Sequence, residues 1–215
     1  MHYTSVLFDL DGTLLDTLGD LTAAMNRTLT RHGLPERTRQ QMRAALGNGA
    51  RRLMELSIPA GTDGALFETL LAEYNADYAA HCRIETAPYP GVDALLRQLH
   101  AQGRKLAIVS NKPDEAVRAL RAEFFADTVP IAVGEKQGIR RKPAPDTLLT
   151  AMVQLGAERT STVYVGDSEV DIATARAAGL PCISVLWGFR DRDVLEQAGA
   201  QQFAADIAQL QALLG

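Results

Sequence analysis

Short apolar runs alternate with longer helical patterns along most of the chain, and this alternation predicts the fold. Five runs have the length and composition of buried strands, at 5–10, 105–111, 128–133, 161–167 and 182–186. Most are followed by a helical pattern: Pro113 is expected at the first position of one such helix, and Gly156 at the end of another. The pattern predicts an α/β fold, in which a doubly wound parallel sheet has helices on both faces.

One long segment, from Thr17 to about Arg83, interrupts this alternation. It contains no convincing strand; an apolar helical stripe begins at Leu18 and ends near Gly33, and further helices are expected at 36–46, 50–57 and 62–82. A crossover between parallel strands needs only about a dozen residues. We therefore expect a core domain of residues 1–16 plus 85–215 and an inserted all-helical cap domain of residues 17–84.

The composition is that of a globular protein without a nucleic-acid or membrane partner. Hydrophobic residues make up 47% of the 215 residues, enough for a sizeable core, and a net charge of −4 gives no reason to expect nucleic acid. No run approaches the roughly 18 apolar residues of a membrane span, and the first residues lack the pattern of a signal peptide. Cys82 and Cys182 are far apart and are expected to be free thiols. These features predict a soluble, cytoplasmic protein.

Polar side chains suited to one chemistry follow several of the predicted strands. In an open parallel sheet, ligands bind outside the carboxyl ends of the strands. The candidates in chain order are Asp9 and Asp11 at the end of the first strand, Ser110 and Asn111 at the end of the second, Lys142 in a later loop, and Asp167 and Asp171 at the end of a further strand.

The spacing of Asp9 and Asp11 favours metal binding and phosphoryl transfer. Carboxylates gathered in one crevice repel each other, and a hard divalent cation with oxygen ligands removes this repulsion. Mg²⁺ is the usual choice when a phosphate shares the site, and Lys142 could hold phosphoryl oxygens beside it. One aspartate could attack phosphorus, while a second, two residues on, could protonate the leaving oxygen and later activate water.

Each aspartate taken alone also has a structural interpretation, because aspartates often end strands and cap helices. Asp16 could cap the helix that follows it, and Asp146 and Asp171 could be helix-terminal residues. A calcium loop of the EF-hand type does not fit "DLDGT", because Leu14 stands where that loop requires glycine. The ordered set of residues, and no single one of them, favours catalysis.

Four stretches, "DLDGTLLDT", "VSN", "RKPAPD" and "GDSEVD", resemble in order the four motifs of the haloacid dehalogenase superfamily of Mg²⁺-dependent phosphatases. The likeness covers the chain nearly end to end. It implies that Asp9 is the nucleophile and Asp11 the general acid and base. It also implies that Mg²⁺ is held by Asp9, the backbone carbonyl of Asp11 and Asp167, with Asp171 supporting the metal site.

The same resemblance implies which groups bind the substrate. Ser110 and Lys142 would bind the phosphoryl group, and Thr13 and Asn111 belong to the same expected substrate-binding set. The helical insert would be a C1-type cap that opens for exchange and closes to exclude water.

Within the superfamily the likeness is greatest to the phosphoglycolate phosphatases, in stretches such as "LAIVSNKP" and "VYVGDSEVD". The turn Gly47-Asn48-Gly49 precedes a predicted helix, whose N-terminus and Arg51 could face an anion and help to select the substrate. A plain turn between helices, with exposed arginines, is the alternative. The segment 17–84 has no lysine, which disfavours phosphonoacetaldehyde hydrolases and β-phosphoglucomutases, since both carry a cap lysine.

The predicted function is therefore Mg²⁺-dependent hydrolysis of a small phosphorylated metabolite through an aspartyl-phosphate, with 2-phosphoglycolate as the expected substrate. A pyrophosphatase, a nucleotidase, or a sugar-phosphate phosphatase or mutase on the same scaffold are the alternatives. A non-catalytic phosphate-binding protein is a further alternative, which the intact catalytic set disfavours. The sequence does not distinguish a monomer from a dimer.

Overall fold

The computed structural model describes residues 3–215, and a six-stranded sheet lies at the centre of its larger part. The strands follow the order β5-β4-β1-β6-β7-β8, and all of their pairings are parallel. Their bounds are β1 Ser5–Phe8, β4 Lys105–Pro113, β5 Ile131–Glu135, β6 Thr162–Gly166, β7 Cys182–Val185 and β8 Gln202–Ala204. Every residue of β1 and β6 is buried, as expected for a parallel sheet covered on both faces.

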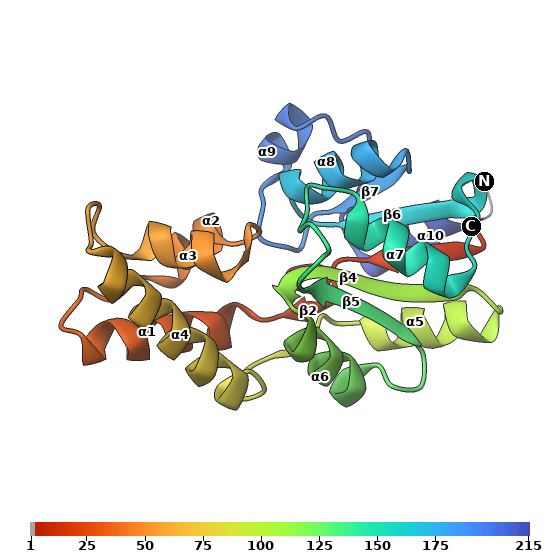
Figure 1. Cartoon of the computed structure of the whole chain (residues 1–215). Coiled ribbons are helices and arrows are strands. Elements are labelled where there is room, and N and C mark those ends of the chain that lie inside the picture. Colours follow the sequence, from red (N-terminus) through yellow and green to blue (C-terminus); the bar gives the residue numbers. More distant parts are fainter. Residues whose placement is uncertain (1–2) are drawn as a thin grey trace. The chain divides into compact units, whose positions relative to one another are not determined.

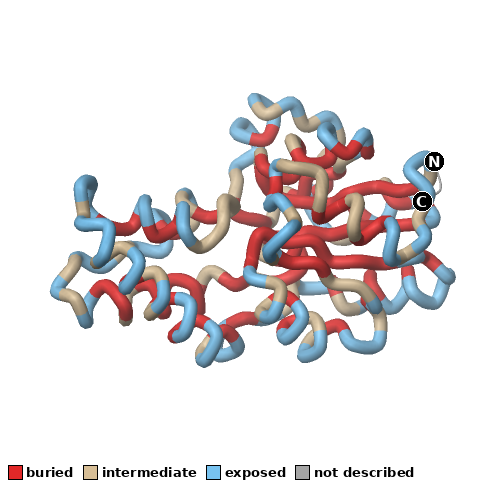
Figure 2. Tube along the Cα trace, viewed as in Figure 1, coloured by how far each residue is buried: buried red, intermediate tan, exposed pale blue. Residues whose placement is uncertain are grey.

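Helices cover both faces of this sheet (Figure 1). Helices α5 Val92–Ala101 and α6 Asp114–Phe124 lie on one side, and α7 Asp146–Leu155 and α8 Glu169–Ala178 lie on the other. Two shorter helices, α9 Arg192–Gln197 and α10 Ile207–Leu214, follow in the chain. Beneath α7 and α8 the core contains Leu7 and Tyr164 from the strands and Leu148 and Ala175 from the helices. Figure 2 shows the strands as the most continuously buried part of this unit.

The predicted α/β fold with a doubly wound parallel sheet is confirmed, with local differences. The five predicted strands correspond to β1, β4, β5, β6 and β7, although β5 lies at 131–135 instead of 128–133. The prediction of Pro113 as the first helical residue is wrong: Pro113 ends β4 and precedes α6, which begins at Asp114. Strand β8 was not predicted, because three residues are too few for a periodic signal.

Residues Asp16–Ala87 form a second compact unit, which is built from helices, while Met1–Leu15 and Pro88–Gly215 form the first. The expected division lay at 17 and 84. The helices are α1 Leu18–Arg31, α2 Arg39–Ala45, α3 Gly49–Ser57 and α4 Gly64–His81. Two short strands, β2 Leu15–Asp16 and β3 Ala87–Pro88, pair in a separate two-stranded sheet. No helix between residues 3 and 215 combines the length and the apolar character that crossing a membrane requires.

The carboxylate of Asp20, near the beginning of the helical unit, is hydrogen-bonded to backbone groups near the end of that unit. Asp20 lies in the first turn of α1 and is 2% exposed. It accepts hydrogen bonds from the backbone N–H groups of Ile84 at 3.0 Å and Thr86 at 2.9 Å, and from that of Glu85 at 2.9 and 3.1 Å to its two carboxylate oxygens. Asp16, expected as a possible helix cap, accepts a hydrogen bond from the N–H of Leu18 at 3.1 Å.

Candidate active site

The candidate site lies at the carboxyl ends of three adjacent strands, β4, β1 and β6. Asp9 follows β1 directly, and its backbone N–H donates to the carbonyl of Val165 in β6 at 2.9 Å. Asp167 follows β6, and Ser110 lies near the end of β4. Because adjacent parallel strands end at one edge, residues that are distant in the sequence meet here.

Three carboxylates lie close together at this edge. One carboxylate oxygen from each of Asp9, Asp167 and Asp171 lies within 4.8 Å of the other two, and all three residues are buried. The carboxylate of Asp11, whose backbone carbonyl is the expected metal ligand, is not part of this group. Oxygen ligands grouped in this way suit a hard divalent cation.

The ammonium of Lys142 lies among these carboxylates. Its Nζ atom is 2.8 Å from Oδ1 of Asp9, 2.8 Å from Oδ1 of Asp171 and 3.0 Å from the hydroxyl oxygen of Tyr164. The side chain of Asn111 holds the backbone of Lys142 with two hydrogen bonds, of 3.0 and 2.8 Å. The "VSN" stretch therefore positions the loop that carries the lysine.

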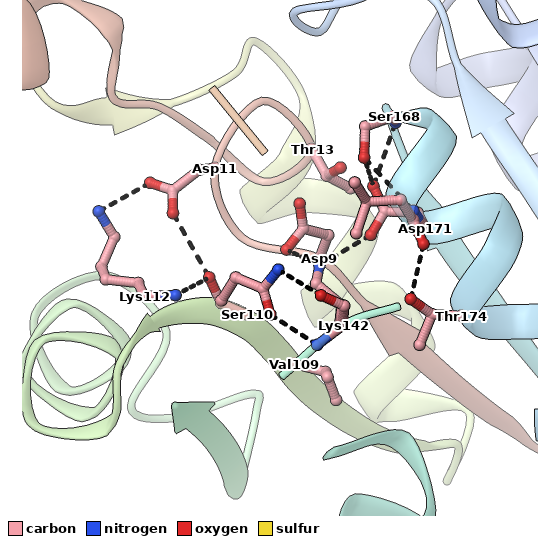
Figure 3. Close-up of polar contacts among 12 residues, drawn as sticks. Asp9, Asp11, Thr13, Val109, Ser110, Lys112, Lys142, Ser168, Asp171 and Thr174 are labelled. Atoms are coloured by element: carbon pink, nitrogen blue, oxygen red, sulfur yellow. Dashed lines mark hydrogen bonds and ion pairs between the residues drawn. The ribbon is translucent and has the colours of Figure 1, made fainter. Parts of the chain in front are cut away.

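Asp171 is held by hydrogen bonds on both of its carboxylate oxygens. Tyr164 donates its hydroxyl hydrogen to Oδ1 at 2.8 Å. The Ser168 hydroxyl donates to Oδ2 at 2.6 Å, and the backbone N–H groups of Ser168 and Asp167 donate to the same oxygen at 3.1 and 3.3 Å (Figure 3). Ser168 is also the N-cap of α8, in a capping box with Asp171. Asp171 is thus a helix-terminal residue and a member of the carboxylate cluster at once.

Asp167 is fixed by contacts from two loops. The Thr13 hydroxyl donates to Oδ1 at 3.3 Å, and the backbone N–H of Phe189 donates to Oδ2 at 2.7 Å. Gly12, with φ +86°, passes so close that a Cβ atom there would collide with the Asp167 carboxylate. The glycine of "DLDGT" is therefore required both for its backbone conformation and for the space that Asp167 occupies.

Asp11 points to a different set of partners. Its Oδ1 atom lies 3.0 Å from Nζ of Lys112, and the Ser110 hydroxyl donates to its Oδ2 atom at 3.4 Å (Figure 3). The structure therefore brings Asp9, Lys142, Asp167 and Asp171 into one cluster and places Asp11 and Ser110 beside it in a second.

The electrostatics of the cluster distinguish its carboxylates. Burial raises the pKa of Asp9 well above its ordinary value, although the charge of Lys142 opposes this rise. Burial and the charge of Asp171 raise the pKa of Asp167 to about 7. Burial acts on Asp171 as well, but the charge of Lys142 and the hydrogen bonds around Asp171 lower its pKa below the ordinary value. Asp171 and Lys142 thus form an internal ion pair. The raised pKa values of Asp9 and Asp167 mean that their charged forms are disfavoured here, and a bound cation would favour those charged forms.

Sequence reasoning missed two side chains of the site, Tyr164 and Lys112. Tyr164 was included in an apolar strand, although its buried hydroxyl needs a hydrogen-bond partner and is itself a signal of a polar site. Lys112 follows the predicted "VSN" motif at the same strand end, and its charge at that edge of the sheet is a similar signal.

The expected substrate-binding residues of the insert lie around the start of α3. Asn48 is the N-cap of α3, and its side chain makes no capping hydrogen bond. The Arg51 guanidinium makes two hydrogen bonds of 2.9 Å to the carboxylate of Glu68 and lies over the ring of Phe67. Within the helical unit, Arg51 therefore already has a counter-charge.

The family model for haloacid dehalogenase-like hydrolases matches residues 6–185 of the chain. The chain therefore belongs to the haloacid dehalogenase-like hydrolase family. The predicted membership of this superfamily is confirmed.

Named relatives agree with this assignment. The chain is 37% identical over 187 residues to a phosphoglycolate phosphatase of Xanthomonas campestris pv. campestris, a match that covers 86% of this chain and 84% of the relative. It is 35% identical over 219 residues to a phosphoglycolate phosphatase of Rhodospirillum rubrum, covering 98% and 90%. A crystal structure of a protein from Lactobacillus delbrueckii subsp. bulgaricus superimposes with a TM-score of 0.94 at 36% identity, covering 100% of this chain and 99% of that one. These relatives support the predicted class of enzyme, a phosphatase.

Proposed function

We propose that the protein is a Mg²⁺-dependent phosphomonoesterase in which Asp9 is the nucleophile. The observation that carries this proposal is the position of the Asp9 carboxylate, which lies 2.8 Å from the Lys142 ammonium and within 4.8 Å of oxygens from Asp167 and Asp171. This arrangement presents an acidic nucleophile beside a cation and a set of metal-type ligands.

The residues present fit a divalent metal ion. Three buried carboxyl groups share a single ammonium, so a second cation would stabilise their ionised forms, and the ligand atoms of this group are oxygens, as Mg²⁺ prefers. Asp9 and Asp167, whose pKa values are raised, would hold the ion together with the backbone carbonyl of Asp11. Asp171 would orient Lys142, because its carboxylate oxygens already accept hydrogen bonds.

We propose the following reaction for these residues. When bound, Mg²⁺ supplies positive charge that offsets repulsion between the phosphate and the carboxylates. An oxygen of Asp9 attacks phosphorus, the bond from phosphorus to the leaving oxygen breaks, and Asp11, which enters this step as the protonated carboxyl group, donates its proton to that oxygen. Asp11 then takes a proton from water, the water oxygen attacks phosphorus, and the bond to Asp9 breaks to release inorganic phosphate. Lys142 and Ser110 would bind the phosphoryl oxygens through both steps.

The substrate that we propose is 2-phosphoglycolate, with the helical unit as the cap that selects it. Phosphoglycolate phosphatases at 37% and 35% identity, matched over most of their length, support this choice. The turn Gly47-Asn48-Gly49 and Arg51 are the cap groups that we propose for contact with the substrate. Since Arg51 pairs with Glu68, it would have to exchange that partner for the substrate's anion or share it.

The test of the catalytic proposal is the variant Asp9→Asn, assayed for phosphate release with Mg²⁺ present. Its activity should be abolished toward every phosphate ester. Asp127→Asn is a matched control, because it makes the same chemical change at an exposed position before β5. Wild-type turnover by freshly purified Asp9→Asn would overturn the proposed mechanism.

A substrate panel tests the choice of substrate separately. It contains 2-phosphoglycolate, pyrophosphate, nucleoside monophosphates and sugar phosphates, with an added isomer assay for mutase activity. The proposal predicts the highest kcat/KM for 2-phosphoglycolate. A higher value for another compound would replace the substrate and leave the catalytic proposal standing.

A further inference from the structure

A second charged pair lies beside the carboxylate cluster, formed by Asp11 and Lys112. The two side chains approach to 3.0 Å; that of Lys112 is 5% exposed and that of Asp11 is 19% exposed (Figure 3). The Ser110 hydroxyl completes the group, because it donates to Asp11 at 3.4 Å and accepts a hydrogen bond from the N–H of Lys112 at 3.2 Å. A lysine this deeply buried requires a counter-charge, and Asp11 provides one.

Consecutive residues at the end of β4 contact two different parts of the site. Ser110 and Lys112 contact Asp11, whereas Asn111, between them, binds the backbone of Lys142. Side chains on a strand alternate between its two sides, which explains this division. The pairing of β4 with β5 is irregular between Val109 and Pro113, so this segment departs from the regular ladder at the point where it meets the site.

The site therefore contains two lysines with separate carboxylate partners. Lys142 binds Asp9 and Asp171, and Lys112 binds Asp11. Asp11 is only two residues from Asp9, so a divalent cation between Asp9 and Asp167 would also attract the Asp11 carboxylate. The Lys112 ammonium, with the Ser110 hydroxyl, holds that carboxylate in a position outside the metal-binding group.

We infer that Lys112 is a positioning residue for the general acid and base Asp11, an inference that rests on the proposed function. By binding one oxygen of Asp11, Lys112 keeps this carboxyl group directed at the leaving oxygen of the substrate instead of at the metal. Lys112 acts through Asp11. Replacing Lys112 should therefore lower the rate most for substrates whose leaving group most needs a proton.

The test uses ring-substituted phenyl phosphates of similar shape, whose leaving phenols differ in acidity. A phenol that is acidic enough leaves as its anion and needs little help from Asp11. We expect Lys112→Met to lower kcat/KM by roughly 10- to 100-fold for the least acidic phenols and by less than about threefold for the most acidic one. Asp11 is also the base for the second step. With the substrate whose phenol is most acidic, Lys112→Met should therefore release a burst of phenol, followed by a slower steady rate.

Three further variants make the result specific to Asp11. Lys112→Arg keeps the charge. The dependence of its kcat/KM on the acidity of the leaving phenol should stay close to that of the wild type. The double variant Lys112→Met/Asp11→Asn should be no slower than Asp11→Asn, because Lys112 acts only through Asp11. Lys105→Met, which removes a lysine at the opposite end of β4, should keep the wild-type dependence.

The possible outcomes separate the inference from the proposed function. An equal loss for all leaving groups, or a further loss in the double variant, would overturn the positioning role while the wild-type enzyme stays active. A loss seen only as a higher KM for substrates that carry a carboxylate would also overturn it, since Lys112 would then bind the substrate itself. A wild-type protein inactive toward the whole series would overturn the proposed function together with this inference.

Discussion

The ammonium of Lys142 lies 2.8 Å from a carboxylate oxygen of Asp9, although 133 residues separate them in the sequence. The side chains are 3% and 9% exposed, so water cannot replace either partner. Asp9 follows β1 directly, and Lys142 belongs to the loop before α7. The contact therefore joins the proposed nucleophile to a distant loop. We expect this ion pair to contribute both to the stability of the folded protein and to the rate of phosphate release.

Replacing Lys142 should harm stability and activity together. Lys142→Met leaves Asp9 and Asp171 without their cation in a buried place, and breaking such a pair costs about 3–5 kcal/mol. The free energy of unfolding in urea, measured without Mg²⁺, checks the stability effect. Adding Asp171→Asn removes one uncompensated charge, so the double variant should be more stable than Lys142→Met alone. A double variant that is less stable would contradict the assigned ion pair.

The raised pKa of Asp167 predicts how stability depends on pH in the absence of metal. Burial and the charge of Asp171 raise this pKa to about 7 in the folded protein, above the ordinary value of 3.8. Between these values the folded state binds more protons than the unfolded state, so stability falls as pH rises through this range. The full difference is at most about 4 kcal/mol. Asp167→Asn lacks this titration and should gain stability relative to the wild type as pH rises.

Urea unfolding in EDTA at about pH 5 and about pH 8 measures this difference. The stability of Asp167→Asn minus that of the wild type should increase between the two conditions. Excess Mg²⁺ at the higher pH should stabilise the wild type, because the ion binds the folded state alone, and should stabilise Asp167→Asn much less. A difference that stays constant with pH, or equal stabilisation of both proteins by Mg²⁺, would contradict the role assigned to Asp167.

The helical unit allows a prediction that is independent of catalysis. Asp20→Ala removes the acceptor of hydrogen bonds from three consecutive backbone N–H groups, at 84–86, and should destabilise the protein by about 2–4 kcal/mol. Asp63→Ala, at the exposed N-cap of α4, is the matched control and should cost about 1 kcal/mol. Urea unfolding of both variants compares the two costs. Equal costs would mean that Asp20 is no more than an ordinary helix cap.

The residues at the strand ends could be identified from the sequence because their positions follow from the parallel sheet alone. Asp9 and Asp167 come directly after apolar runs, and adjacent parallel strands place such residues at one edge. The pairing of lysines with carboxylates could not be identified in this way. It depends on the irregular end of β4, which directs Lys112 to Asp11, and on the loop that brings Lys142 to Asp9.

Contacts between segments that are far apart in the sequence could not be predicted from sequence patterns either. Asp20 has the ordinary appearance of an acidic residue in a first helical turn, and its contact with residues 84–86 requires the whole helical unit to be folded. Tyr164 fits an apolar strand by its ring, while its hydroxyl is used by Lys142 and Asp171. In both cases the residue type was compatible with a local role, so periodicity alone could not reveal the long-range one.

The most direct test of the central claim is to identify the residue that becomes phosphorylated during turnover. Enzyme quenched while hydrolysing a phosphate ester is treated with borohydride, which reduces an aspartyl-phosphate to homoserine, and the peptide spanning β1 and its following turn is sequenced by mass spectrometry. If Asp9 is the nucleophile, homoserine is found at position 9 and unchanged aspartate at position 11. Reduction at Asp11 or Asp167, or an unmodified protein that turns over at the full rate, would contradict the role of Asp9.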